Sequence, residues 1–305
     1  MPELPEVETI RRDLVARLLG QSFTSIEVLS SKTASHPAVF FANNLRDRKI
    51  IKLERRGKLL IFKLSLKKET PRNRSTKSQL DYLLIHLKMT GQLVYLDKKE
   101  KVAGGHSLSG DSFMTAVGGE LPNKHTRAVF GFKNGGQLFF NDLRKFGYLK
   151  LVTAEELARL LKNNYGPEPL TKDFSYPFLK ATLKNKKVKT KVLLLNQKLI
   201  AGLGNIYVDE ALWAARVNPE RIAGSLTEPE IKKLWQVINA VIRKAIAYRG
   251  TTFRNYVDSR GQQGNFSDRL AVYGRQGQSC QNCHSLIAKK KVAGRGTHYC
   301  PNCQK

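Results

Sequence analysis

The chain opens with the stretch Met1-Pro2-Glu3-Leu4-Pro5-Glu6-Val7-Glu8, in which prolines and carboxylates precede a helical pattern. Apolar residues then recur at helical spacing on one face between residues 5 and 20, at Val7, Ile10, Leu14 and Leu18. Proline is favoured in the first turn of a helix, and carboxylates there interact well with the positive end of the helix dipole. The stretch therefore predicts an amphipathic helix over 5–20.

Pro2 offers a second interpretation of the same stretch. If Met1 is removed, Pro2 becomes a secondary amine at the chain start. An α-amino group has a pKa of about 7.7–8.0, so part of it is unprotonated near neutral pH, whereas a lysine is held as ammonium. Such an amine can attack an electrophilic carbon. A helix start and a nucleophilic terminus are compatible. Whether Pro2 is a nucleophile has to be judged from the motifs in the rest of the chain.

Net charge indicates the kind of partner. The 305 residues include 53 Lys and Arg against 25 Asp and Glu, a formal charge of +28, and 41% are hydrophobic. Such an excess of positive charge is typical of proteins that bind a polyanion, with nucleic acid favoured over an anionic membrane. No apolar run approaches the length of a membrane span, and the start lacks the pattern of a secretory signal. We therefore expect a cytoplasmic protein without a membrane partner.

Residues 24 to 152 have the pattern of short β-strands separated by turns. The turn Asn134-Gly135-Gly136 predicts a hairpin, because these residues tolerate positive φ. Many short strands without helices between them favour a β-sandwich or barrel, interrupted here by two expected loops at 66–79 and 97–123. The expected strands are Thr24–Ser30, Ile50–Glu54, Leu59–Ser65, Asp81–Leu87, Gln92–Leu96, Arg127–Phe132, Gln137–Asn141 and Tyr148–Val152.

From Thr153 onward the periodicity becomes helical. Thr153 and Thr227 precede acidic residues in the manner of helix N-caps. The predicted helices are 153–163, 177–195, 206–216 and 227–248. The fold class is therefore α+β, with an N-terminal β-sandwich domain at 1–152, a helical domain at 153–270 and a C-terminal segment at 271–305.

All the cysteines lie in the C-terminal segment, in two Cys-x2-Cys pairs. Four thiolates at this spacing can converge tetrahedrally on one zinc ion, so the sequence predicts a structural zinc ribbon over 271–305. The ribbon contains lysines and arginines but no acid, which suits it to phosphates. The predicted ligands are Cys280, Cys283, Cys300 and Cys303.

A second acid-free basic segment spans 178–200 and leads into Gly202-Leu203-Gly204-Asn205-Ile206. The glycines allow backbone N–H groups to approach an anion, and Asn205 can cap a helix that begins at Ile206. This indicates a phosphate-binding helix terminus. The alternative is an ordinary helix connection beneath a solvated lysine face.

Taken together, these motifs resemble the formamidopyrimidine-DNA glycosylase family of bifunctional base-excision repair enzymes. The resemblance rests on Pro2–Glu8, Gln197–Glu210, the lead-in Ala271–Arg275 and the four-cysteine ribbon, and it covers almost the whole chain. It implies a β-sandwich, a helix–two-turn–helix domain and a zinc ribbon. It also implies a bacterial-type, nucleoid-associated enzyme that removes 8-oxoguanine and formamidopyrimidines from duplex DNA and then cuts the strand. A single active site further suggests that the protein acts as a monomer.

The resemblance implies roles for the first catalytic residues. Pro2 would attack C1′ of the damaged nucleoside, displace the base and form an iminium ion that serves as an electron sink. Glu3 matches the family's acid and base at the sugar ring oxygen, and Glu6 matches a supporting carboxylate.

Two basic residues match the family's elimination steps. Lys58 matches the proton donor in β-elimination, and Arg295 the ribbon arginine of δ-elimination. The pKa of arginine is above about 12, so we interpret Arg295 as a phosphate clamp and electrostatic stabiliser.

Further matches concern DNA binding. Extruding a base costs about a few kcal/mol of stacking and pairing, and the resemblance implies that Met89, Arg144 and Phe146 form the wedge that fills the gap. The implied backbone contacts are His125, Arg144, Lys187 and Asn205, and Lys191 is an implied neighbour of the lesion pocket. Leu143 and Lys145 depart from the family's usual proline and arginine, which predicts a looser wedge turn and one bidentate phosphate contact fewer.

The polar segment Thr251–Leu270 resembles the family's loop over an extruded 8-oxoguanine, which favours oxidised purines as substrates. Two alternatives stay open at this point. The first is endonuclease VIII-like activity on oxidised pyrimidines, and the second is a non-catalytic zinc-ribbon protein that binds DNA.

Overall fold

The computed structural model describes residues 2–66, 80–106, 108, 112–251 and 266–305. By contacts the chain divides into two compact units. Unit 1 comprises Met1–Leu161 and Arg249–Gly264, and unit 2 comprises Lys162–Tyr248 and Asn265–Lys305. The predicted domain limits at 152 and 270 stay predictions. No helix in the described part of the chain is both long enough and apolar enough to cross a membrane.

The predicted N-terminal helix is confirmed as α1 (Leu4–Leu18). A capping box between Glu3 and Glu6 closes its first turn, and the backbone N–H of Glu3 donates to Glu6 Oε2 at 2.9 Å. The predicted apolar face is buried at Val7, Ile10 and Leu14, and Leu18 continues it. Each such side chain contributes about 1.5–3 kcal/mol on burial, so this face attaches the chain start firmly to the core.

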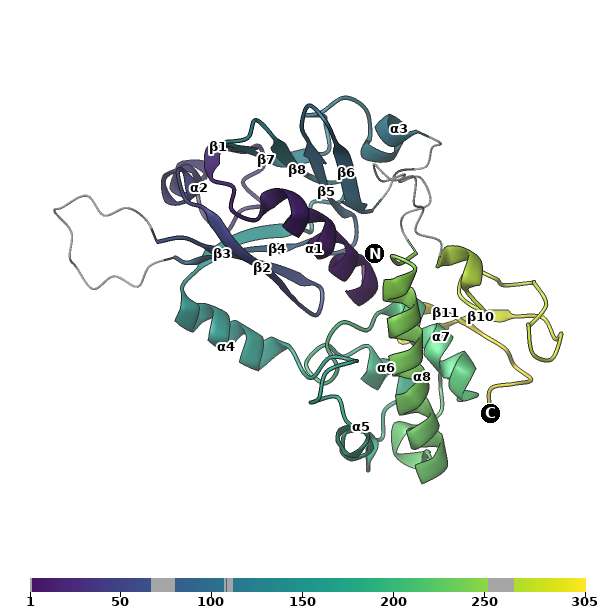
Figure 1. Ribbon diagram of the computed structural model, residues 1–305. Helices are drawn as coiled ribbons and strands as arrows, with labels where there is room; N and C mark the ends of the chain where they lie inside the picture. Colours follow the sequence, from purple (N-terminus) through teal and green to yellow (C-terminus); the bar gives the residue numbers. More distant parts are fainter. Residues whose placement is uncertain (1, 67–79, 107, 109–111, 252–265) are drawn as a thin grey trace. The chain divides into compact units, whose positions relative to one another are not determined.

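Unit 1 is a β-sandwich, as predicted (Figure 1). Both sheets are antiparallel and contribute to one hydrophobic core. The first sheet has the order β1 (Phe23–Val28), β7 (Thr126–Phe132), β8 (Gln137–Asp142), β5 (Gly91–Leu96) and β6 (Lys101–Gly105). The second has the order β2 (Ile50–Arg56), β3 (Leu59–Leu64), β4 (Tyr82–His86) and β9 (Tyr148–Val152).

Helices cover three edge strands of the sandwich. Helix α1 packs against the edge strands β2 and β6, one from each sheet (Figure 1). A further helix, α2 (Ala38–Leu45), packs against β1, the other edge of the first sheet. Covered edges do not pair with other chains, and here the predicted catalytic residues Pro2, Glu3 and Glu6 lie at the start of the covering helix α1.

The prediction of a loop over 97–123 is wrong, because this segment contains β6 and helix α3 (Phe113–Val117). Glycines suggested a loop, but Gly104 lies within β6. A Cβ atom there would lie 2.4 Å from Ile10 Cγ1 of α1, so glycine allows the strand to pass directly under the helix. The expected loop at 66–79 lies outside the described residues beyond position 66.

The helical pattern after residue 153 is confirmed in type. Thr153 and Glu156 exchange capping hydrogen bonds, and Thr227 and Glu230 form a capping box. The helices are α4 (Ala154–Asn164), α5 (Tyr176–Leu183), α6 (Thr190–Leu194), α7 (Asn205–Ala215) and α8 (Glu228–Ala247), with short 3-10 turns at Ala223–Ser225 and Ser267–Arg269.

The single helix predicted over 177–195 is wrong. It is interrupted between α5 and α6, where Asn185 adopts a left-handed φ of 59° and the lysines at 184, 186 and 187 are exposed. Closely spaced like charges and an asparagine with positive φ both disfavour a continuous helix. The break places these basic side chains in a connection on the surface of unit 2.

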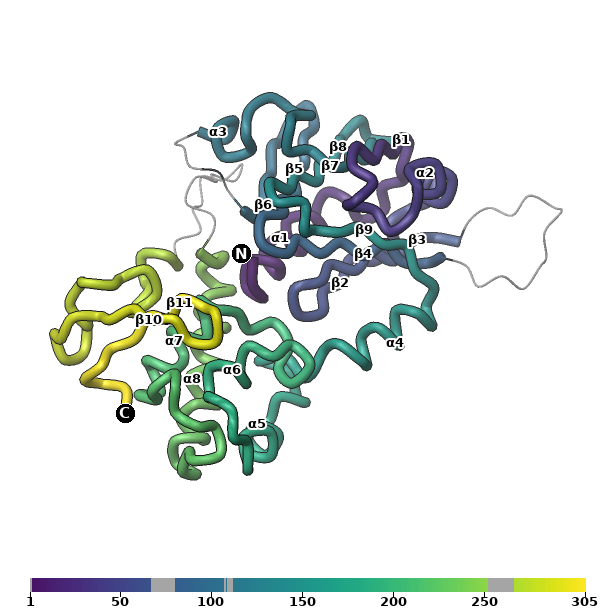
Figure 2. The backbone as a smooth tube through the Cα atoms, turned by 180° about the vertical axis from the view of Figure 1, so that it is seen from behind, coloured from purple at the N-terminus to yellow at the C-terminus, as the bar shows by residue number. Residues whose placement is uncertain are grey.

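The C-terminal segment forms an antiparallel hairpin of β10 (Ala288–Val292) and β11 (Arg295–Tyr299). Strand β11 packs against α7 of the same unit (Figure 2). Cys280 and Cys300 lie in the small hydrophobic core of this region, together with Val272 and Ile287.

Candidate active site, wedge and metal centre

The predicted catalytic residues at the chain start are buried. Pro2 is buried, and Glu3 and Glu6 are 1% and 0% exposed. Glu6 Oε1 accepts hydrogen bonds from the Thr251 backbone N–H at 2.8 Å and from its hydroxyl at 3.2 Å, while Oε2 accepts from the Glu3 N–H. Glu6 therefore joins the start of α1 to the beginning of the predicted recognition loop, whose residues 252–265 lie outside the described part.

Lys58 follows Gly57 in the tight turn between β2 and β3 and is only 7% exposed. The turn is tied to α1 through Arg55, which forms an ion pair with Glu8 and donates to the Gly57 carbonyl. Burial alone would raise the pKa of Glu8, but hydrogen bonds from Arg11 and other arginines lower it to about 2. Pro2, Glu3, Glu6 and Lys58 thus belong to one unit, with the lysine turn anchored to the helix that begins beside Pro2.

His86 lies beside this turn, because it pairs with Leu59 in the β3–β4 register. Burial lowers the pKa of His86 to about 3, with further lowering by the charges of Lys88 and Lys58. The imidazole is therefore neutral at physiological pH, and its Nδ1 accepts the backbone N–H of Lys88 at 2.9 Å. The end of β4 presents a neutral acceptor in surroundings of positive charge.

The three predicted wedge residues meet in space although they come from two turns. Arg144 Nη1 donates to Met89 Sδ at 3.4 Å, and the Arg144 guanidinium carbon lies 4.9 Å from the centre of the Phe146 ring. Phe146 is 52% exposed. An exposed aromatic ring, a thioether and a guanidinium in contact are suited to insertion into a base stack.

His125 is half-buried in unit 1, next to the first residues of β7. Desolvation lowers the pKa of its imidazole, and the charges of Lys124 and Arg127 lower it further. A neutral ring can still accept or donate a hydrogen bond. Lys187 is exposed in the connection between α5 and α6 of unit 2, where its charge is available to an anion.

Asn205 does not cap α7, contrary to prediction. The helix begins at Asn205 itself, and its N-cap is Gly204, in an extended conformation. Asn205 Nδ2 instead donates to the Gly296 carbonyl at 2.8 Å. The Asn205 amide is therefore bonded to β11. Arg295, the neighbour of Gly296, is exposed at the start of β11 in unit 2.

Lys191, the implied neighbour of the lesion pocket, lies in the interior of unit 2, and its role toward the lesion stays a prediction. The side chain is 0% exposed, and Nζ donates to Asp209 Oδ1 at 2.5 Å and to Thr297 Oγ1 at 2.8 Å. Asp209 also accepts the His298 N–H at 2.9 Å. A buried lysine needs such a charged partner, and this pair joins α6 to α7 and to β11.

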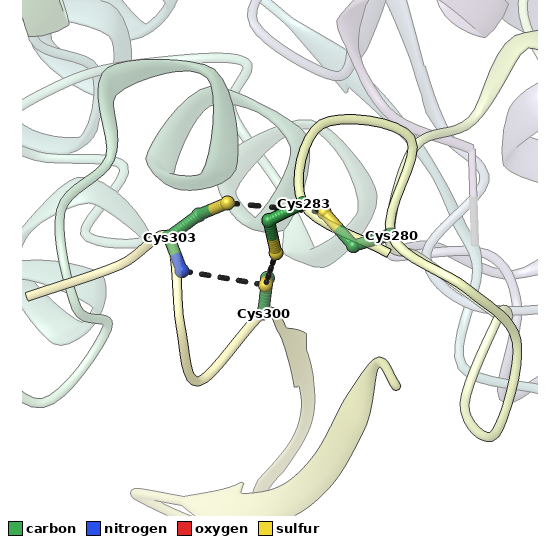
Figure 3. A group of neighbouring side chains, drawn as sticks. All are labelled: Cys280, Cys283, Cys300 and Cys303. Atoms are coloured by element: carbon green, nitrogen blue, oxygen red, sulfur yellow. Dashed lines mark hydrogen bonds between the residues drawn. The ribbon is translucent and has the colours of Figure 1, made fainter. Parts of the chain in front are cut away.

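The predicted zinc ligands converge (Figure 3). Their sulfur atoms all lie within 4.8 Å of one another, with 3.9 Å between Cys280 and Cys303 and 3.4 Å between Cys283 and Cys300. Tetrahedral thiolates about 2.3 Å from zinc are about 3.8 Å apart, so the four side chains fit this ion. Trp213 of α7 donates its indole N–H to Cys280 Sγ at 3.4 Å.

Sequence reasoning did not identify His86 or Trp213 as functional groups, and it did not foresee the bond of Thr251 to Glu6. The Glu6–Thr251 contact spans 245 positions, and the Trp213–Cys280 contact spans 67. No local pattern signals a partner so far along the chain. For His86, its place beside Lys88 and Met89 at a strand end was the only available signal.

Comparisons with known proteins match all three parts of the chain. The model described as "Formamidopyrimidine-DNA glycosylase N-terminal domain" matches residues 1–149. The model described as "Formamidopyrimidine-DNA glycosylase H2TH domain" matches 165–257, and "Zinc finger found in FPG and IleRS" matches 277–305. The zinc finger model and the four-sulfur cluster together show a structural zinc site.

Similar proteins include one curated relative and two solved structures. The chain is 43% identical over 307 aligned positions to the formamidopyrimidine-DNA glycosylase of Pelotomaculum thermopropionicum, covering 100% of this chain and 99% of that protein. A Lactococcus lactis FPG mutant bound to Fapy-dG-containing DNA has a TM-score of 0.82 at 36% identity, with 100% of both chains covered. A MutM structure in complex with carbocyclic 8-oxo-G-containing DNA has a TM-score of 0.80 at 35% identity, again over 100% of both chains.

Proposed function

Because this chain belongs to the formamidopyrimidine-DNA glycosylase family, we propose that Pro2 is the nucleophile with which it removes oxidised purines from DNA. The chain is a base-excision repair glycosylase with abasic-site lyase activity, and its partner is damaged double-stranded DNA. The comparisons favour oxidised purines over the oxidised-pyrimidine alternative, and an enzyme over a non-catalytic binding protein.

In the proposed reaction the amine of Pro2, freed by removal of Met1, attacks C1′ of the damaged nucleoside. The bond from C1′ to the base breaks, and the base leaves with the bonding electrons and takes up a proton. The sugar ring opens as Glu3 delivers a proton to its oxygen, which leaves a cationic imine between Pro2 and C1′. Glu6 positions this start of the chain through its hydrogen bonds to Glu3 and Thr251.

The cationic imine then promotes strand cleavage. Loss of a proton from C2′ sends electrons toward the imine nitrogen while the 3′ phosphate leaves, and a second elimination releases the 5′ phosphate. We propose that Lys58 transfers protons in the first elimination. Arg295 stabilises a phosphate through its permanent charge during the second. Water finally releases Pro2 from the sugar fragment.

We further propose that Met89, Arg144 and Phe146 fill the gap left by the extruded base. Lys187, Asn205 and His125 would contact the DNA backbone, and Lys191 would support the ribbon from inside unit 2. The proposed division is a catalytic domain at 1–152, a DNA-binding domain at 153–270 with its recognition loop near 251–270, and a zinc ribbon at 271–305. The protein would act as a monomer at the nucleoid in the cytoplasm.

The observation that carries this proposal is the burial of Pro2 and Glu3 immediately before α1, with Glu6 of its first turn bonded both to Glu3 and to Thr251. Borohydride reduction during turnover of an 8-oxoguanine duplex tests it, because borohydride converts an imine into a stable amine. We expect a covalent protein–DNA product with the wild type and much less with Pro2→Gly. An undamaged duplex is the control, and the intact mass must show that Met1 is absent. A wild type that traps no DNA, or a Pro2→Gly variant that traps as much, refutes the mechanism.

A further inference from the structure

Asp142 is a completely buried carboxylate at the end of β8. Its Oδ1 accepts the Thr90 hydroxyl at 2.5 Å and the Arg144 N–H at 3.2 Å, and its Oδ2 accepts the Gly147 N–H at 2.6 Å. Hydrogen bonds to an ionised acceptor are stronger than neutral ones. Both ends of the turn that carries Arg144 and Phe146 are therefore bound to one carboxylate.

Thr90 links this turn to the one that carries Met89. Its hydroxyl donates to Asp142 and also accepts the Arg144 backbone N–H at 3.0 Å. The two turns leave the sheet side by side, because Gly91 and Asp142 are paired in the β5–β8 register. One hydroxyl and one carboxylate, which together we call the wedge clamp, thus connect residues that lie 52 positions apart.

The backbone of both turns adopts conformations that such support stabilises. Lys88 and Lys145 adopt left-handed φ angles of 51° and 59°, which residues with a side chain rarely adopt. Leu143 and Lys145 are exposed, so neither packs the turn against the core. At Gly147 a Cβ atom would lie 2.6 Å from Phe140 Cζ, so the chain passes too close to the core for any other residue.

We infer that Thr90 and Asp142 are positioning residues that set the geometry of the wedge and so the rate at which the damaged base is extruded. This inference rests on the proposed function, in which Met89, Arg144 and Phe146 enter the base stack. Neither Thr90 nor Asp142 touches the reacting atoms in that proposal. Their effect reaches the chemistry only through the three wedge side chains, so it depends on whether a base must be extruded.

Thr90→Val tests the wedge clamp, because valine has the shape of threonine without the hydroxyl. We expect single-turnover excision of 8-oxoguanine to slow about tenfold, the rate equivalent of one hydrogen bond to a charged group. A 2-aminopurine next to the lesion should report base extrusion slowed by the same factor. Strand cutting at a preformed abasic site should stay within about twofold of the wild type, because no base has to be unstacked there.

Thr90→Ser is the matched control, since it keeps the hydroxyl and should excise 8-oxoguanine at about the wild-type rate. Asp142→Asn is a second variant. In one orientation of the amide its NH2 group faces the Gly147 N–H, and in the other it faces the Arg144 N–H. Two donors then face each other, so one of these hydrogen bonds is lost in either orientation. We expect the same preferential loss on 8-oxoguanine, with thermal unfolding used to verify that each variant is folded.

The possible results distinguish failure of the positioning role of Thr90 and Asp142 from failure of the proposed function. A wild type that leaves 8-oxoguanine in place refutes the proposed function. An active wild type whose Thr90→Val variant excises 8-oxoguanine at an unchanged rate, or loses both activities equally, refutes the positioning role alone.

Discussion

Replacing Trp213 with phenylalanine should weaken zinc binding although all four cysteine ligands are kept. The indole N–H of Trp213 donates to Cys280 Sγ at 3.4 Å, and the ring packs on the core that contains Cys280 and Cys300. Phenylalanine keeps most of that packing and removes the donor. The thiolate would then lose one of the groups that stabilise its negative charge.

The magnitude follows from this geometry. A hydrogen bond to a charged group contributes about 1.5–3 kcal/mol, and loss of such a partner outside the ligand shell costs about 10- to 100-fold in metal affinity. Trp213 is half-buried, and Asn282 donates to Cys280 through its backbone N–H and to Cys303 through its side chain. The cluster thus keeps other donors, and we expect the lower end of that range, about tenfold.

Competition with a chromogenic chelator measures the zinc affinity directly. Trp235→Phe is the matched control, because this second tryptophan also donates its indole N–H, but to the Phe174 carbonyl at 2.9 Å. We expect Trp235→Phe to hold zinc as tightly as the wild type. Unchanged affinity in Trp213→Phe, or an equal loss in both variants, would show that the N–H···S bond does not stabilise the metal site.

Two further predictions concern buried charge. Lys191→Met leaves Asp209 buried without its cation and should lower the free energy of unfolding by about 3–5 kcal/mol. The double variant Lys191→Met with Asp209→Leu should lose less of this free energy. An unchanged urea midpoint together with weakened DNA binding would instead favour Lys191 as a DNA contact. The pKa of His86 is about 3 in the folded protein against 6.5 as its ordinary value, so the unfolded chain binds the proton more readily and stability falls as pH drops from 6.5 toward 3. In His86→Asn the melting temperature should fall less over this pH range than in the wild type. A pH dependence of this variant identical to that of the wild type would contradict a neutral imidazole in the folded protein.

Much of the fold was predictable because its signals are local. The caps at Thr153 and Thr227, the hairpin at Asn134–Gly136 and the short strand segments separated by turns depend on residues within a few positions of one another. The zinc ligands were predictable for a related reason, since two short knuckles separated by one hairpin bring four thiols together.

Errors arose where distant contacts outweighed local preference. Glycines at 104 and 105 indicated a loop, but the approach of α1 made glycine the residue that fits in β6. Asn205 has the chemistry of a helix cap, yet the Gly296 carbonyl of β11 takes its amide.

The roles of Pro2 and of the wedge residues rest on the family resemblance and stay proposals. The sequence by itself determined most of the helices and strands, where most of them begin, and which residues are the zinc ligands. These properties follow from backbone preferences, hydrophobic periodicity and ligand spacing, which act over short distances. Only the tertiary structure decided that Glu6 holds Thr251, that Asp142 binds both wedge turns and that Trp213 supports the metal site. Most of those contacts join residues far apart in the chain, and their stability depends on burial that exists only after the chain has folded.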